Sequence, residues 1–215
     1  MTNVSIIITN YNNAKYLGRA IRSCLKQTEK AEVIVVDDCS TDESQDILYS
    51  FGDKIKRVIL TENGGVANAS NEGIRSADSE YVMRVDSDDY INENMVAIFS
   101  QVLEWNKNLG FVYGDMLKVD QDEKVLERVD INTLDLLLRH GAGIMFRKSY
   151  LEAIGLYNKE LRNAEDYDLV KRYITNWDGF HLPLPLYRYR QHDTNMTNSE
   201  ETRKEWEKLA DENRK

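Results

Sequence analysis

"VMRVDSDDYI" (residues 82–91) passes from an apolar run directly into three carboxylates within four positions. The carboxylates are Asp86, Asp88 and Asp89. The apolar run is typical of a buried strand. Like charges this close repel one another unless a positive group lies between them. The stretch therefore predicts a buried strand whose end forms a charged site with a cationic partner.

The same type of apolar run occurs three more times before it, at 4–9, 32–38 and 57–60. These runs lack the alternation of a half-exposed strand, so they predict a sheet buried on both faces. Between the runs, apolar or small residues recur at spacings of three and four, as on a helix. The alternation predicts an α/β fold with a doubly wound, mostly parallel central sheet and helices on both faces. The helical stripes are Ala14, Leu17, Ile21 and Cys24; Val66, Ala69, Gly73 and Ala77; and Met95, Ile98, Val102 and Trp105.

One helix start has a signature of its own. Ser40 is followed three residues later by Glu43. This is the spacing of a capping box, in which both side chains satisfy free backbone N–H groups. The pattern predicts a helix over about 41–51.

The second half of the chain has a different pattern, in which strand-like segments are less regularly separated by helices. It still contains no repeat and no proline-rich linker, so we expect one domain over 1–215. The expected elements are a hairpin at 110–130, a short helix at 132–141, a strand at 142–146, a helix at 164–176 and an extended segment at 184–192.

The composition limits the classes of function. The chain has 215 residues, 41% of them hydrophobic, and a net charge of −9, which disfavours nucleic acid as a partner. Cys24 and Cys39 lack metal-type spacing and suggest reduced thiols. There is no signal peptide and no run near the roughly 20 apolar residues that span a bilayer. We therefore expect a cytoplasmic protein, at most peripheral at the inner face of the membrane.

Polar clusters follow each of the four predicted strands, at 9–13, 37–42, 62–65 and 86–89. In open α/β sheets, ligands bind beyond the carboxyl ends of the strands, so we expect one shared crevice. Each cluster also has a plainer interpretation, in which aspartates cap the following helices and glycines form ordinary turns. The D-x-D at residues 86–88 favours a ligand, because Mg²⁺ or Mn²⁺ bridging a diphosphate would neutralise the repulsion.

Seven segments together resemble family 2 glycosyltransferases of the GT-A fold. They are "SIIITNYNN", "VIVVDDCSTDES", "NGGVANASNEGI", "YVMRVDSDDYI", "AGIMFRKSYLEAIGLYNKEL", "EDYDL" and "YRYRQHDTNMT", and they cover about residues 4–198 in the family's order. The resemblance implies a nucleotide-sugar donor, with a UDP-sugar favoured, and transfer with inversion. It implies a nucleotide-sugar-binding half at about 1–115, an acceptor-binding half at about 116–198 and a charged helix or tail at 199–215.

The resemblance also implies roles for single residues on the donor side. Asp38 would accept a hydrogen bond from the base, with Asp37 beside it, and Asp86 would face the ribose or the donor sugar. Asp88 would bind the metal ion, Mn²⁺ or Mg²⁺, with Asp89 as support, and His192 would make a further metal or diphosphate contact. The remaining nucleotide-sugar-binding residues would be Thr9 and Tyr11 at the base, and Asn63, Gly65 and Asn71.

The acidic pair Glu165 and Asp166 matches the family's catalytic acids, with Asp166 as the base. The plainer interpretation is a solvated helix start, where acids interact favourably with the helix dipole. Tyr187 to Arg190 alternate along an extended segment, so either one arginine reaches the diphosphate or the segment is a polar sheet edge. His140 and His181 have no supporting context and receive no role.

One departure concerns the motif "NGGVANASNEGI". The family often has arginine where this chain has Ser70, and that arginine commonly helps to hold the base or phosphate. Arg84, just before the D-x-D, is an unusual strand residue and could replace some of that charge.

Other classes of protein fit less well. A sugar nucleotidyltransferase needs a glycine-rich basic loop after the first strand, and the chain has no glycine there before Gly18. A dinucleotide-binding dehydrogenase needs G-x-G-x-x-G at the same place, which is absent. A non-catalytic sugar-binding relative should have lost one of the acids at 86, 88, 165 or 166, and all four are present. We expect a hexosyl- or N-acetylhexosaminyltransferase of glycan or polysaccharide synthesis, with a glycan or lipid-linked acceptor and the option of a homodimer.

Overall fold

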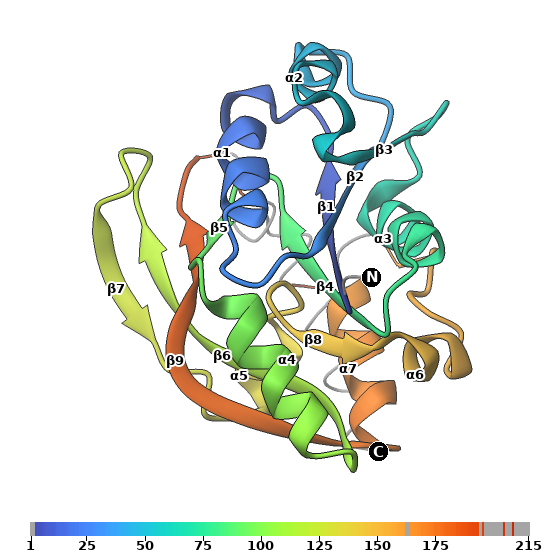
Figure 1. Ribbon diagram of the computed structural model, residues 1–215, viewed down its shortest axis with the longest axis vertical. Helices are drawn as coiled ribbons and strands as arrows, with labels where there is room; N and C mark the ends of the chain where they lie inside the picture. The colour runs from blue at the N-terminus through green and yellow to red at the C-terminus, as the bar shows by residue number, and fades with distance from the viewer. Residues whose placement is uncertain (1–2, 162–163, 194, 196–203, 205–207, 209–215) are drawn as a thin grey trace.

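The computed structural model describes residues 3–161, 164–193, 195, 204 and 208 (Figure 1). They form one nine-stranded sheet with the strand order β3-β2-β1-β4-β8-β6-β9-β5, and β7 pairs with β6 off this path. In chain order the elements are β1 (Val4–Asn10), α1 (Ala14–Leu25), β2 (Glu32–Asp37), α2 (Ser44–Ser50), the 3₁₀ turn η1 (Gly52–Lys54), β3 (Lys56–Ile59), α3 (Gly65–Ser76), β4 (Tyr81–Asp86), β5 (Tyr90–Ile91), α4 (Met95–Trp105), β6 (Leu109–Val119), β7 (Val125–Val129), α5 (Leu134–Leu138), β8 (Met145–Arg147), α6 (Lys148–Ala153), α7 (Glu165–Ile174) and β9 (Asp178–Arg190).

The first half of the sheet is parallel, as its apolar runs predict. β1 pairs in parallel with β2 on one side and β4 on the other, and β2 pairs in parallel with β3. All seven residues of β1 are buried, because helices cover both faces of this central strand. The register sets Thr9 opposite Val36 and Asp86, so the carboxyl ends of the three central strands finish at one level. The predicted shared crevice is therefore a feature of the sheet.

Helices lie on both faces of the sheet, with α4 in front of it and α7 behind it in Figure 1. α3 packs on β1 and β2, where a Cβ atom on Gly73 would clash with the side chain of Ile7. The small residues in the predicted stripe of this helix thus allow its close approach to the sheet.

The second half of the sheet mixes strand directions. β8 runs antiparallel between β4 and β6, and β6 and β7 form the predicted hairpin. β9 pairs in parallel with β6 along most of its length and antiparallel with β5. Because partners lie on both sides of the Tyr187–Arg190 segment, the interpretation of this segment as a polar sheet edge is wrong.

The predicted capping box is also wrong. α2 begins only at Ser44 and has no side-chain cap at its start. The Ser40 hydroxyl instead donates a hydrogen bond of 2.6 Å to Asp37, which draws Ser40 into the loop after β2. The predicted tail at 199–215 lies outside the described residues except for Lys204 and Lys208. Among the described helices, none is long and apolar enough to cross a membrane.

Candidate active site

The loops after β1 and β2 are joined through the buried carboxylate of Asp37. This carboxylate accepts hydrogen bonds from Asn10 Nδ2 at 2.7 Å and from Ser40 Oγ at 2.6 Å. Thr9 is buried at the end of β1, whereas the neighbouring Tyr11 ring is 51% exposed. Asp37 is thus an internal support for the loops, and Tyr11 is the side chain here that offers an open aromatic surface.

Asp38 connects β2 to the start of α3. Its two carboxylate oxygens accept hydrogen bonds from the backbone N–H groups of Gly64, at 2.9 Å, and Gly65, at 2.7 Å. Asn63 donates to the backbone oxygen of Asp38 at 3.3 Å, and Gly65 has a φ of +82°, which favours glycine. Asp38 therefore does not cap the helix that follows it, and its oxygens keep a second lone pair each for a ligand.

The D-x-D loop after β4 meets the end of β9. Asp88 Oδ2 lies 2.9 Å from Nε2 of His192, although the two residues are 104 positions apart in the sequence. Asp89 is buried and accepts hydrogen bonds of 2.7 Å from the Tyr187 hydroxyl and the Arg190 backbone N–H. Burial and the neighbouring carboxylates raise the pKa of Asp89 well above its ordinary value. Asp89 thus anchors the loop from inside, as support for Asp88.

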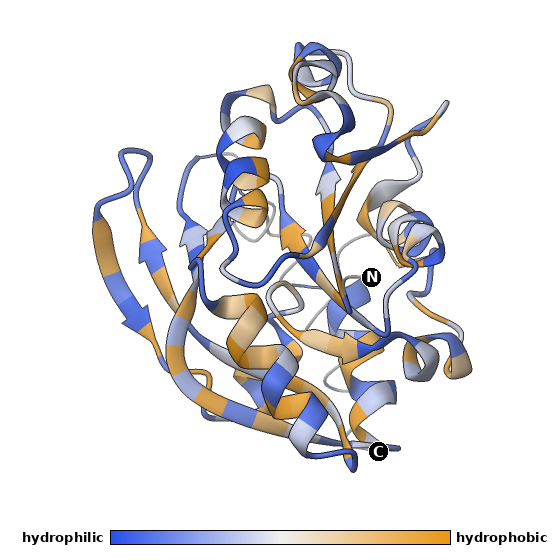
Figure 2. Cartoon of the chain, viewed as in Figure 1, coloured by the Kyte–Doolittle hydropathy of each residue, from blue (hydrophilic) through white to orange (hydrophobic). Residues whose placement is uncertain are grey.

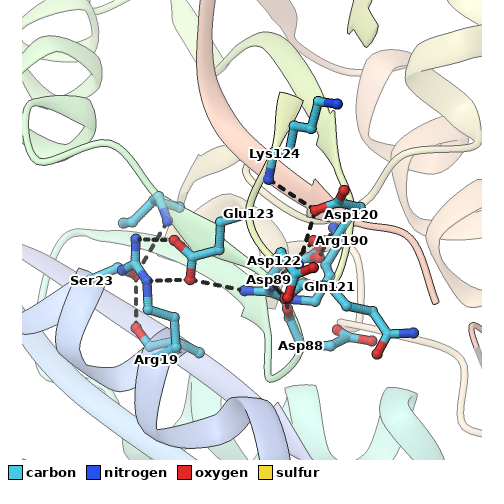
Figure 3. Close-up of polar contacts among 12 residues, drawn as sticks. Arg19, Ser23, Asp88, Asp89, Asp120, Gln121, Asp122, Glu123, Lys124 and Arg190 are labelled. Atoms are coloured by element: carbon cyan, nitrogen blue, oxygen red, sulfur yellow. Dashed lines mark hydrogen bonds and ion pairs between the residues drawn. The ribbon is translucent and has the colours of Figure 1, made fainter. Parts of the chain in front are cut away.

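Arg190 fastens the loop further, as Figure 3 shows. Its side chain is 3% exposed, and its Nε donates to the backbone oxygen of Asp88 at 2.9 Å. Its Nη1 donates to the backbone oxygen of Gln121 at 3.0 Å, in the turn of the β6–β7 hairpin. In the same turn, Glu123 pairs with Arg190 at 3.3 Å and with Arg19 of α1 at 2.8 Å. Arg190 therefore joins the D-x-D loop to the hairpin turn, and a diphosphate contact by an arginine of this segment stays a prediction.

Sequence reasoning missed this hairpin turn, 120–124, as part of the site. The tip is hydrophilic in Figure 2, so its pattern looks like that of any exposed turn. The sequence offers two arginines near the end of this strand, Arg188 and Arg190, but their partners cannot be read from the sequence. The ring of His192, which follows β9, also has a partner in another element. It stacks on Tyr16 of α1 with ring centroids 5.1 Å apart.

Asp88 and His192 suit a divalent metal ion by the chemistry of their donor atoms. A carboxylate oxygen and an imidazole nitrogen both bind Mn²⁺, and Mg²⁺ is commonly held by one or two carboxylates together with substrate phosphates and water. Within the described residues there is no cluster of three or more histidine, cysteine, aspartate or glutamate ligands. The pair therefore fits an ion that shares its coordination with a bound diphosphate, rather than a closed structural metal site.

The acidic pair lies at the start of α7, next to Arg84 of β4, and it is not a solvated helix start. The side chain of Glu165 is 8% exposed and that of Asp166 is 18% exposed. Arg84 donates to both carboxylate oxygens of Asp166 at 2.8 Å each, and its Nε lies 3.1 Å from Asp86. Burial and the charge of Asp166 raise the pKa of Glu165 to about 8. The interpretation as a solvated start is wrong, because Glu165 is buried and Asp166 pairs with a buried guanidinium.

The pKa of Asp86, the third carboxylate next to Arg84, is also raised. Burial and the charges of Asp88 and Asp166 raise the pKa of Asp86 to about 6, although Arg84 acts in the other direction. The Tyr187 hydroxyl accepts a hydrogen bond from the Asp86 backbone N–H at 3.2 Å. Asp86 thus interacts electrostatically with Asp88, with Asp166 and with Arg84.

Asn71 does not lie on the polar surface of the crevice. It is buried, its Nδ2 donates to the backbone oxygen of Tyr157, and its Oδ1 accepts from the backbone N–H of Tyr157, both at 2.9 Å. The Tyr157 ring lies 5.8 Å from the Arg84 guanidinium. Asn71 therefore supports Arg84 through Tyr157, and both of its polar atoms are used inside the protein. Ser70 and Arg84 line the same small internal cavity, so Arg84 brings positive charge to the region of Ser70.

His140 also lies near the acidic pair, although its sequence context offers no reason to assign it a role. Burial lowers the pKa of His140 to about 4, although Asp166 acts in the other direction. Its Nε2 is buried without a hydrogen-bond partner, and its ring lies edge-on to Tyr187 at 6.3 Å. His181 lies elsewhere, paired with Asp115 at 2.7 Å.

Comparison with known proteins identifies similar chains. The model of a family described as glycosyl transferase family 2 matches residues 5–155. An uncharacterized glycosyltransferase of Rickettsia typhi is 34% identical over 212 residues, which cover 91% of this chain and 66% of that protein. This chain therefore spans just under two thirds of that relative's length.

Two solved structures have the same architecture. S. aureus TarS 1-349 in complex with UDP-GlcNAc matches with a TM-score of 0.78 and 25% identity, over 92% of this chain and 61% of that one. Mannosyltransferase PcManGT from Pyrobaculum calidifontis, in complex with GDP-Man and Mn²⁺, matches with a TM-score of 0.71 and 20% identity, over 90% of this chain and 58% of that one. The second likeness concerns the fold alone.

Proposed function

This chain belongs to glycosyl transferase family 2 and has the GT-A fold, and on that premise we propose that it is an inverting, metal-dependent transferase. It would move a hexosyl or N-acetylhexosaminyl group from a nucleotide-diphosphate sugar to a hydroxyl of a glycan or lipid-linked acceptor. A UDP-sugar is the favoured donor, because the TarS structure contains UDP-GlcNAc. The product would belong to polysaccharide or glycan synthesis.

The observation that supports this proposal most strongly is the pairing of Asp88 and His192 at 2.9 Å. Two candidate metal ligands from distant parts of the chain meet at the carboxyl end of β4, where ligands bind in open α/β sheets. The acidic pair Glu165 and Asp166 forms a separate group, joined to β4 through Arg84. The donor diphosphate would then bind near Asp88 and His192, and the reacting hydroxyl would bind near the acidic pair.

On the donor side, the residues have distinct tasks. The exposed Tyr11 ring offers a stacking surface for the base, next to Thr9, and Asp38 offers free lone pairs beside the amide of Asn63. Asp37 and Gly65 hold the loops that carry these groups. Asp88 and His192 would hold Mn²⁺ or Mg²⁺, which supplies Lewis-acid stabilisation of the departing diphosphate.

On the acceptor side, Asp166 would act as the general base. The acceptor hydroxyl attacks C1 of the sugar in line with the bond to the diphosphate, and its proton passes to Asp166 as the new C–O bond forms. A positioned base of this kind typically contributes about 10²–10⁴-fold. Glu165, with its pKa raised to about 8, is mostly uncharged at neutral pH. Asp166 is the carboxylate of the pair that lies closest to Arg84.

Release of nucleoside diphosphate from a panel of donors tests this function. UDP-GlcNAc, UDP-glucose, GDP-mannose and dTDP-glucose would be incubated with the protein and Mn²⁺ or EDTA, and the free diphosphate measured. We expect release from one UDP-sugar, with inversion of the anomeric configuration of the hydrolysed sugar in NMR spectra, and loss of release in EDTA. Release that is insensitive to EDTA contradicts the metal site. Donor binding without release, across the panel and with added glycan acceptors, favours a sugar-binding protein.

A further inference from the structure

Arg84 is the centre of a buried charge cluster that the reaction outlined above does not use. Its side chain, on the interior strand β4, is 7% exposed. One edge of its guanidinium donates to both oxygens of Asp166, while Nε on the other edge lies 3.1 Å from Asp86. Glu165 is 3.8 Å away. Burying a charge is costly unless well-aligned partners offset the loss of hydration, and the bidentate pair with Asp166 provides such a partner.

The bidentate pairing of Arg84 with Asp166 fixes the orientation of the carboxylate and also places a positive charge beside it. A guanidinium is planar and rigid, so two parallel N–H···O bonds hold a carboxylate in one plane and at one angle. A single bond, or an ammonium group, leaves the carboxylate free to rotate. The same guanidinium plane also contacts Asp86, so Arg84 sets the distance between the donor-side carboxylate and the acceptor-side carboxylate.

We propose that Arg84 is a positioning residue, which orients the carboxylate of Asp166 relative to the donor sugar held near Asp86. The proposal rests on the function proposed above, because it takes Asp166 as the base. In-line attack requires the reacting hydroxyl to be aimed at C1 as well as deprotonated, and a carboxylate held in one plane provides that aim.

Arg84 is itself held in place by groups with no direct part in the chemistry. The Tyr157 ring lies beside its guanidinium at 5.8 Å, and Asn71 fixes the backbone of Tyr157 through two hydrogen bonds of 2.9 Å. A Cβ atom on Gly141 would clash with the Asp166 carboxylate, so glycine at this position leaves room for the bidentate pair. These contacts explain the buried position of Asn71 better than a role in nucleotide binding does.

A direct role of Arg84 in holding the donor phosphates fits the contacts less well. Both terminal nitrogens already donate to Asp166. Nε makes no aligned hydrogen bond, but it is buried and faces Asp86 rather than the pair of Asp88 and His192. A phosphate would also have to approach a guanidinium that is 7% exposed and already lies next to Asp166, Asp86 and Glu165.

The test compares Arg84→Lys and Arg84→Ala with the wild type and with Arg147→Lys. Arg147 is a matched control, since it is also a buried arginine, lies on β8 at the opposite end of β4, and pairs with Glu80 at 2.8 Å. For each folded variant, kcat and KM for UDP release from UDP-GlcNAc with Mn²⁺ would be measured, together with the Kd for UDP by calorimetry. Arg84→Ala would also be measured with added guanidinium ion, at concentrations that leave the wild type unchanged.

We expect Arg84→Ala to lower kcat by about 10²-fold, the scale of effect for a misplaced reacting group, while the Kd for UDP is unchanged. Added guanidinium should restore part of this kcat. Arg84→Lys should also lose kcat, because it keeps the charge and loses the fork, and it remains informative if the alanine variant does not fold. Arg147→Lys should keep its kcat.

Three outcomes would overturn the inference. Wild-type kcat in Arg84→Lys would mean that charge alone suffices. A weaker Kd for UDP with unchanged kcat would make Arg84 a donor-binding residue. A loss of kcat in Arg147→Lys equal to that in Arg84→Lys would indicate general damage to the sheet. The proposed function is tested separately by Asp166→Asn: if that variant keeps its turnover, the base is misassigned, whatever the Arg84 variants do.

Discussion

Two buried arginines, Arg84 of β4 and Arg190 of β9, organise the candidate site, and they make different kinds of contact. Arg190 donates mainly to backbone oxygens, of Asp88 and of the hairpin turn, and so fixes the path of the chain around the metal-binding pair. Arg84 donates to carboxylates and so fixes the charge and direction of the acidic pair. The first arginine shapes the loop that we propose to bind the donor, whereas the second orients the carboxylate that we propose as the base. Variants of the acidic pair should therefore change kcat, whereas variants near Asp88 should change the binding of UDP.

The largest effect is expected on the acidic side. Asp166→Asn keeps the shape of the side chain and removes its basicity, so kcat and kcat/KM for UDP-GlcNAc should fall together by about 10²–10⁴-fold. The Kd for UDP with Mn²⁺ should be unchanged. Steady-state kinetics and calorimetry on the same preparation check both expectations. Normal turnover would show that Asp166 is not the base, and Glu165 would become the next candidate.

The next effect is expected on the metal-binding side and should appear in binding. Asp88→Asn and His192→Ala should weaken Mn²⁺-dependent binding of UDP by at least about 10-fold, since even outer-shell partners of metal ligands contribute about 10–100-fold. UDP titrations with Mn²⁺ and with EDTA separate metal-dependent from metal-independent binding. Affinity that stays at the wild-type level in Asp88→Asn would remove Asp88 from the metal site.

Removing the contacts of Arg190 with the backbone around Asp88 should lower both the free energy of unfolding and the affinity for UDP. Arg190→Met leaves buried carbonyl groups without donors, so we expect a fall of about 1–3 kcal/mol in the free energy of unfolding. Mn²⁺-dependent UDP binding should weaken as well, because the backbone of Asp88 loses its anchor. Urea unfolding and calorimetry measure the two effects. The control is Arg128→Met, which changes an arginine pairing with Asp115 away from the crevice, and it should leave UDP binding unchanged.

The smallest effect concerns the pH dependence of stability. The pKa of Glu165 rises from 4.5 to about 8 on folding, so between these pH values the folded state keeps a proton that the unfolded state has lost. The wild type should therefore lose stability from this group as pH rises through that window. Glu165→Gln has no such proton, so its stability relative to the wild type should increase from pH 5 to pH 8. Urea midpoints of both proteins across this range provide the measurement, and a constant difference would contradict the raised pKa.

Much of the donor side could be predicted from the sequence. Mainly apolar, β-branched runs such as 4–9 and 32–36 favour buried strands, and polar residues directly after parallel strands meet at one edge of the sheet. Asp88 and His192 were expected near the metal because each lies in a motif, and the structure brings them to 2.9 Å. Their catalytic roles stay predictions until they are measured.

Other features of the site could not be read in this way, because they depend on long-range partners. Ser40 fits a capping box by spacing, but the buried carboxylate of Asp37 is a stronger competitor for its hydroxyl. Asn71 lies in a motif of the donor half, yet its amide is used by Tyr157, which is 86 positions away. In each case a local pattern is compatible with several partners, and packing selects one of them.

The sequence by itself determined the class of fold, the edge of the sheet where ligands would meet, and most of the acidic and polar residues at that edge. Hydrophobic periodicity is a local property and predicts the strands and helices, and the resemblance to family 2 glycosyltransferases identified the acidic residues beyond the strand ends. Only the tertiary structure decided that Arg84 faces Asp166, that Arg190 joins the hairpin turn to the D-x-D loop, and that Glu165 is buried enough to hold a proton near neutral pH. The partners and burial of a charged side chain depend on elements that are far apart in the chain, and these become neighbours only when the sheet is assembled.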